Sequence, residues 1–275
     1  MPYALARGHI AGAVVVVVRG NGPVLAKGYG FADVASRKPV SPDATLFRPG
    51  SVSKLFTWTA VMQQVEAGKL DLDKDVNTYL DFKIPPYEGK PITLRQIMTH
   101  TAGFEESIRL LISNDPKGPM ALKLYARDAL PARVFAPGTT PAYSNYATSL
   151  AGYIVERVSG MAFDDYVEQR IFAPIGMTRS SFRQPLPPAL RPMMASGYPD
   201  VTQKAKPYEV VVPAPAGSLA ATGSDMGRFM VAHLDGGAGL VKPEAARMVL
   251  AVDLQTRQAL RQLNDLLVTD RHNPP

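Results

Sequence analysis

Residues 47–54 read Phe-Arg-Pro-Gly-Ser-Val-Ser-Lys and lead from a polar loop into an apolar helical pattern. The apolar residues from Leu55 to Val65 recur at the spacing of one helix face, so Ser51 lies at a helix N-terminus. Unpaired backbone N–H groups and the positive end of the helix dipole favour an alkoxide there. Lys54 follows three residues later and projects from the same face. Ser51 is therefore a candidate nucleophile and Lys54 a candidate acceptor of its proton; the alternative is a capping serine beside a surface lysine.

Tyr143-Ser144-Asn145 precedes a second apolar helical pattern, which runs from Ala147 to Val158 and is followed by Gly160 as the expected C-cap. A tyrosine beside an ammonium group can move protons, and an asparagine amide can bind a substrate carbonyl. The alternative is that Ser144 or Asn145 only caps the helix while Tyr143 packs. Taken alone, this segment does not decide between the two.

The composition is that of an ordinary soluble globular protein, with 275 residues, 46% hydrophobic and 20% charged. This length allows one large domain or two modest lobes. The net charge is +6, but the basic residues are scattered and the densest group is only Arg37-Lys38, which argues against a nucleic-acid surface. The absence of cysteine excludes disulfides, thiolate metal sites and cysteine nucleophiles.

No metal or cofactor site is expected. The four histidines are isolated in the sequence. The acidic run 71–75 resembles the start of a calcium loop, but Val76 stands where glycine is needed and Phe82 where glutamate is needed. Nucleotide-binding glycine motifs and the Gly-x-Ser-x-Gly elbow are also missing from the sequence.

The chain begins with a predicted β-hairpin, formed by residues 13–18 and 24–29 around Gly20-Asn21-Gly22, and continues mostly as helix. Helices are expected at 94–100 with Thr93 as N-cap, at 163–172 ended by Pro174, at 226–234 capped by Ser224, and at 243–267. Residues 209–212 are a weak strand candidate, within a proline-rich stretch at 181–217.

Four segments together resemble the serine β-lactamase and penicillin-binding-protein superfamily, in the branch of class C β-lactamases, family VIII esterases and D-alanyl-D-alanine carboxypeptidases. They are 47–54, 92–103 with its His-Thr-Ala-Gly ending, 143–145 preceded by Pro137-Gly138, and 215–229. Their order and spacing agree with the family from about residue 10 to 240.

This resemblance implies an α/β (α+β) fold, with an antiparallel sheet flanked by helices, a mainly helical lobe, and the site between them. Residues 1–275 would form one domain, with 1–50 and 205–275 in the α/β lobe and 51–204 in the helical lobe. Ser51 would attack an ester or amide carbonyl, Lys54 and Tyr143 would move the proton with either as the base, and Asn145 would position the substrate amide. The Ser51 N–H would form half of the oxyanion hole.

The family's third motif, Lys-Thr-Gly or His-x-Gly on a later strand, is not found after residue 230. The strand that carries it would supply the second oxyanion donor, whose loss costs about 100- to 1000-fold in turnover. We therefore expect weak activity from this chain alone, with an unpaired edge on its hairpin. The alternative function is a non-catalytic member that binds a peptide, a cell-wall fragment or a protein partner through the same cleft.

The expected substrates are small esters, β-lactams or D-amino-acid peptides, with an esterase or carboxypeptidase favoured over a dedicated β-lactamase. No nucleic-acid partner is expected, and a homo-oligomer is left open. The apolar run 10–18 is shorter than the ~20 residues that span a bilayer, and it lacks the features of a signal peptide. The resemblance implies a periplasmic or other extracytoplasmic location, which no export signal in the sequence supports.

Overall fold

The computed structural model describes residues 1–20, 22–107, 110–115 and 118–251. The strands are β1 (Gly12–Arg19), β2 (Gly22–Asp33), β3 (Lys38–Pro39), β4 (Leu46–Phe47), β5 (Ile112–Ser113), β6 (Ser180–Ser181), β7 (Val210–Val211) and β8 (Ala220–Thr222). The α-helices are α1 (Pro2–Arg7), α2 (Lys54–Glu66), α3 (Leu94–Met98), α4 (Leu122–Asp128), α5 (Asn145–Ser159), α6 (Phe163–Val167), α7 (Ala214–Gly217) and α8 (Gly223–Leu234), and residues 243–251 are also helical. Short segments of other helix types are η1 (Gly50–Ser53), η2 (Val76–Thr78), η3 (Glu168–Phe172), η4 (Ala173–Ile175) and η5 (Arg191–Met193).

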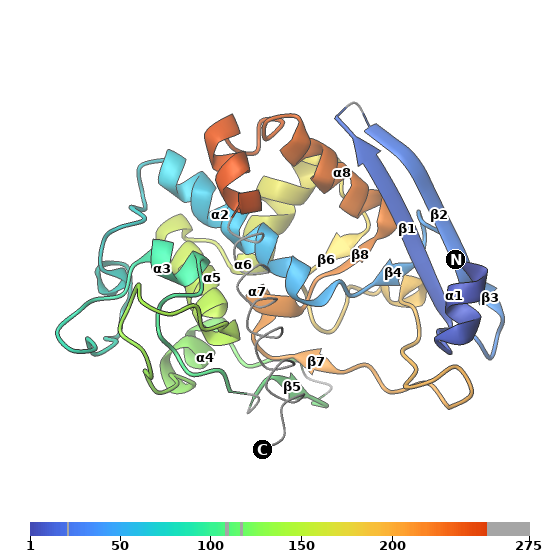
Figure 1. The fold of residues 1–275 in the computed structure, drawn as a ribbon, viewed down its shortest axis with the longest axis horizontal. Helices are drawn as coiled ribbons and strands as arrows, with labels where there is room; N and C mark the ends of the chain where they lie inside the picture. Colours follow the sequence, from blue (N-terminus) through green and yellow to red (C-terminus); the bar gives the residue numbers. More distant parts are fainter. Residues whose placement is uncertain (21, 108–109, 116–117, 252–275) are drawn as a thin grey trace, which may run out of the picture.

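Three small antiparallel sheets hold the strands, in the orders β1-β2-β3, β4-β8-β6 and β5-β7. The long β1–β2 hairpin lies at one side of the molecule with α8 along it, while α2 and α5 run through the helical part (Figure 1). The predicted mixed class, a sheet flanked by helices with a helical lobe, is therefore confirmed. The weak strand candidate corresponds to β7, and β5 and β6 add short strands inside residues 51–204.

The predicted hairpin pairs along its length, from Gly12 opposite Gly30 to Arg19 opposite Gly22. Asn21 of the expected turn lies outside the described residues. Helix α8 approaches β1 closely at Gly223, where an added Cβ would meet a methyl group of Val14 at 2.6 Å. Glycine at this position therefore allows the helix to lie against the strand.

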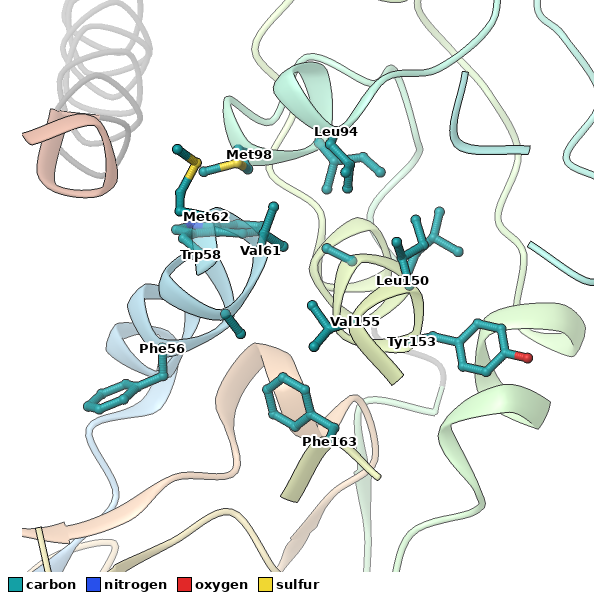
Figure 2. Close-up of a cluster of buried hydrophobic side chains, with 14 of the residues drawn as sticks. Phe56, Trp58, Val61, Met62, Leu94, Met98, Leu150, Tyr153, Val155 and Phe163 are labelled. Carbon is teal, nitrogen blue, oxygen red and sulfur yellow. The ribbon is translucent and has the colours of Figure 1, made fainter. Parts of the chain in front are cut away.

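The hydrophobic core is centred on α2 and α5. In Figure 2, Met62 of α2 lies beside Met98 of α3 and Val61 lies on the side toward α5, whereas Phe56 points away from α5 and Phe163 of α6 lies below. Phe56 is fully buried and stacks on Phe229 of α8 at a ring-centroid distance of 3.8 Å. The rings of Phe172 and Phe182 meet its edges. These contacts join the start of α2 to the rest of the molecule.

Most predicted helix ends are found where the sequence places them. Thr93 forms a capping box with Gln96, and Gly160 ends α5 in the left-handed conformation. The cap predicted for α8 is wrong: Thr222, not Ser224, accepts the hydrogen bond from the N–H of Asp225. The helix begins three residues earlier than expected because β8 leads directly into it.

Two further expectations differ in detail. The helix expected at 163–172 is α6 followed by the π-helical η3; Pro174 does not end it, because the short turn η4 continues to Ile175 and Gly176 caps it. Helix α3 ends at Met98, and His100 adopts a positive φ of 55° just beyond it. The helix predicted at 243–267 is present as far as residue 251, and the remainder lies outside the described residues. The two-lobe division by residue number stays a prediction.

None of the helices in the described part of the chain is long and apolar enough to cross a membrane.

Candidate active site

Ser51 lies in η1, the short helical turn that continues directly into α2. The preceding Gly50 has a φ of +58°, a conformation that glycine adopts without steric cost. Ser53 is fully buried and donates its hydroxyl to the carbonyl of Gly50 at 2.6 Å, which ties the turn together. Ser51 is exposed, and its N–H belongs to a first turn whose N–H groups lack partners within the helix. The turn therefore exposes the Ser51 side chain next to backbone N–H groups that have no partner within the helix.

Lys54 is buried, with 4% of its surface exposed, directly under Ser51. Its ammonium nitrogen lies 3.2 Å from Ser51 Oγ, 2.7 Å from Asn145 Oδ1 and 2.7 Å from the carbonyl oxygen of Ala216. An ammonium group has three hydrogens to donate, so these three acceptors match its capacity. The alternative of a surface lysine is thus inconsistent with the structure.

Tyr143 completes the environment of the serine. Its hydroxyl donates to Ser51 Oγ at 2.5 Å, and the Lys54 nitrogen lies 4.7 Å from the centre of its ring. Ser51 Oγ therefore accepts hydrogen bonds from both Lys54 and Tyr143. The two segments that the sequence singled out, 47–54 and 143–145, come together at one point although about 90 residues separate them.

His100 packs against the ring of Tyr143 and binds the backbone of the next residue. Its ring lies 4.6 Å from the ring of Tyr143, and its Nδ1 accepts the backbone N–H of Ser144 at 3.2 Å. Burial, and then the charge of Lys54, lower the pKa of His100 to about 3. The imidazole is therefore neutral near pH 7, and because Nδ1 accepts a hydrogen bond, its proton sits on Nε2.

Asn145 links the lysine to an acidic residue. Its Oδ1 accepts from Lys54, while its Nδ2 and its backbone N–H donate to the two carboxylate oxygens of Glu106, each at 2.8 Å. Lys54 can only donate and an ionised Glu106 only accepts, so the neighbours fix the orientation of the amide. Ser144 caps α5 through Ala147, so one segment supplies both a cap and two side chains of the site.

Sequence reasoning missed three groups at this site: Glu106, the carbonyl of Ala216 and the supporting role of His100. Glu106 follows the Gly103 turn, where the pair Glu105-Glu106 is visible in the sequence without an indication of its partner. The Ala216 carbonyl is a backbone group, so its residue type carries no signal. In the described part of the chain, no cluster of three or more potential metal ligands is found.

A family model described as Beta-lactamase matches residues 3–269. The chain belongs to the Beta-lactamase family. The superfamily that the sequence motifs resemble is thereby confirmed. A β-lactamase from Escherichia coli K12 is 29% identical over 209 residues, which cover 75% of this chain and 52% of the relative. The protein flp from Staphylococcus aureus N315 is 29% identical over 187 residues, which cover 66% of this chain and 37% of the relative.

Solved structures of this β-lactamase family share the fold. A penicillin-binding protein homologue from Pyrococcus abyssi, described as octameric, superposes with a TM-score of 0.75 at 26% identity, covering 89% of this chain and 57% of that one. A β-lactamase/D-alanine carboxypeptidase from Pseudomonas syringae gives a TM-score of 0.72 at 27% identity, with coverages of 90% and 66%. The chain thus spans about a third to a half of the two curated relatives and under two thirds of these structures.

Proposed function

We propose that this β-lactamase family chain carries the nucleophilic part of a serine hydrolase that forms an acyl-enzyme on Ser51. The observation that carries the proposal is the pair of hydrogen bonds that Ser51 Oγ accepts from Lys54 and Tyr143. A serine hydroxyl is a weak nucleophile until a neighbouring base takes its proton. Both candidate proton carriers lie within hydrogen-bond range of the one atom that would react.

Tyr143 is the better candidate for the base. All three hydrogens of Lys54 have acceptors, two of them at 2.7 Å, and this favours the protonated ammonium form of the lysine. The ammonium near the Tyr143 ring in turn favours a phenolate. In the proposed step, Tyr143 first releases its phenol proton to solvent, and the resulting phenolate then takes the Ser51 proton while Oγ bonds to the substrate carbonyl carbon.

The remaining steps use groups that are already in place. The oxyanion of the tetrahedral intermediate would accept from the Ser51 N–H. Tyr143 would return its proton to the leaving oxygen or nitrogen as the bond to the acyl carbon breaks. Water would then release the acyl group from Ser51, with the proton of the water passing back through the same pair.

The proposed substrate class rests on the relatives. The Pseudomonas syringae protein is described as a β-lactamase/D-alanine carboxypeptidase, and a similar structure from Burkholderia cenocepacia as a D-alanine carboxypeptidase. We propose small esters, β-lactams or D-amino-acid peptides as substrates, with ester or peptide cleavage favoured over dedicated β-lactam hydrolysis. A homo-oligomer is also proposed, in keeping with the octameric relative.

The decisive experiment is intact-mass analysis after incubation with a fluorophosphonate or penicillin. We expect one adduct on the wild-type chain, none on Ser51→Ala, and a retained adduct on Ser53→Ala, the matched control from the same turn. No adduct on folded wild-type protein would contradict the proposal and favour a non-catalytic binding role. Circular dichroism of each variant shows whether it is folded.

A further inference from the structure

A small cavity of about 200 Å³ is lined in part by Glu106, the residue that accepts hydrogen bonds from Asn145 of the candidate site. Its lining includes Glu105, Glu106, Tyr125 and Tyr146, together with apolar residues such as Leu130. Among the residues that the structure describes, the lining brings two carboxyl groups and two aromatic rings together without a lysine, arginine or histidine. Carboxylates and aromatic faces are the groups that bind ammonium ions in proteins.

Glu106 has unused capacity to accept hydrogen bonds. Each of its oxygens accepts one bond from Asn145, whereas an ionised carboxylate offers about four acceptor sites. Its side chain is exposed, and no salt bridge to it is found within the described ranges. Burial and the charge of Glu106 raise the pKa of Tyr125 to about 12, so the neighbouring phenol stays neutral. Among the described lining residues, Glu105 and Glu106 therefore have no cationic neighbour, and Lys54 reaches Glu106 through Asn145.

Glu106 also accepts a hydrogen bond from the Asn145 side-chain amide, the group that would position a substrate carbonyl. The Nδ2 group of Asn145 donates to Glu106 Oε1 at 2.8 Å, so a substrate carbonyl must displace a charge-assisted hydrogen bond to reach it. A substrate carboxylate at this position would meet a like charge. An ammonium group would instead gain the free acceptor sites of Glu106 and leave its bonds to Asn145 intact.

We propose that Glu106 selects substrates whose acyl part carries a free amino group, such as esters or amides of unblocked amino acids. The proposal rests on the hydrolase function proposed above, because it places the acyl carbon at Ser51 and the amino group at Glu106. A chain of three hydrogen bonds, through Lys54 and Asn145, connects these two residues. Glu106 is thus a specificity residue that touches the substrate without taking part in bond cleavage.

The test compares three methyl esters, of alanine, N-acetylalanine and propionic acid, with both enantiomers of the first two. Assays at about pH 6 keep the amino group charged. We expect the wild-type chain to prefer the alanine ester by about 10- to 100-fold in kcat/KM, the usual effect of one charge-assisted hydrogen bond. Glu106→Gln should lose this preference, which is read as the ratio of kcat/KM for the alanine ester to kcat/KM for methyl propionate within the same variant. Glu88→Gln, which changes an exposed carboxylate elsewhere, should behave as wild type.

A binding measurement separates this proposal from the hydrolase function. In the Ser51→Ala background, NMR titration with the same esters should show tighter binding of the alanine ester, and Glu106→Gln should remove the difference. If the wild-type chain cleaves none of the esters but the binding preference is present and depends on Glu106, the hydrolase proposal fails and the amino-group site stands. Equal binding of the three esters, or a preference that persists in Glu106→Gln, would overturn the amino-group site whatever the turnover.

Discussion

Helix α2 and the β1–β2 hairpin are both rich in apolar residues, yet they are buried to very different extents. Nine of the thirteen residues of α2 are buried, including the charged Lys54. The hairpin strand β1 contains five consecutive valines, and no residue in it is fully buried. In the described part of the chain, β1 is also an edge strand of its sheet. The helix that follows the nucleophile is therefore anchored in the core, while the hairpin depends mainly on backbone pairing and on its contacts with α8.

This contrast explains how the site keeps its geometry. A buried lysine is tolerated only because all of its donors are satisfied, and those acceptors are fixed by α5 and α7, which pack on α2. The groups that hold Lys54 in position therefore lie on η1, which leads into α2, and on α5 and α7. Substitutions in this region are expected to have large effects, and equivalent substitutions in the hairpin small ones.

The largest effect is expected from Lys54→Met, which keeps most of the side-chain volume and removes the ammonium. Loss of a proton-handling group lowers the rate by about 100- to 10,000-fold. The rate of fluorophosphonate labelling at Ser51 measures this change. Lys69→Met, at an exposed lysine just after the same helix, is the control and should label at the wild-type rate. An unchanged rate in folded Lys54→Met would show that the lysine does not assist the serine.

Next in size is the effect of Phe56→Ala on stability. Phe56 is fully buried among three other phenylalanine rings, so its truncation should lower the free energy of unfolding by about 3–5 kcal/mol. Val24→Ala in the hairpin, at a side chain that is 62% exposed, should change it by less than about 0.5 kcal/mol. Urea denaturation followed by circular dichroism measures both. Similar decreases in the free energy of unfolding for the two variants would show that α2 and the hairpin do not differ in their contribution to stability.

A smaller effect concerns pH and His100. Its pKa falls from 6.5 to about 3 on folding, so the unfolded chain binds more protons between these values and stability falls as the pH is lowered through this range. The loss is at most about 5 kcal/mol over the whole range, and about 3 kcal/mol between pH 7 and pH 4. Asp164 acts in the opposite sense, because burial raises its pKa to about 6 and its neutral form favours the folded state at low pH.

Comparison with His100→Asn isolates the histidine, because the contribution of Asp164 is common to both proteins. Asparagine tolerates the positive φ of this position and can accept the Ser144 N–H. Thermal unfolding between pH 4 and 7 should show a shallower dependence on the acid side for the variant. Identical profiles would mean that His100 does not titrate with the unfolding transition.

The sequence alone determined the local structure around the nucleophile. Glycine and serine before an apolar helical pattern place Ser51 at a helix start, and the spacing of three residues sets Lys54 beneath it, because both are properties of a single helix. The hairpin, the Thr93 cap and the end of α5 at Gly160 were also predictable, because each depends on residues that are close together in the sequence. The cap of α8 was not, because Thr222 and Ser224 are both good caps and pairing of β8 with β4 and β6 selected between them.

Only the tertiary structure decided which distant groups meet. Two acceptors of Lys54, Asn145 and the Ala216 carbonyl, are far from it in the chain. The contact of His100 with Tyr143 and the bond between Glu106 and Asn145 also join distant residues. Such contacts follow from the packing of α2, α5 and α7, which residue spacing does not encode. The carbonyl of Ala216 shows this most clearly, because a backbone oxygen exists at every position and only the fold determines which one accepts from the lysine.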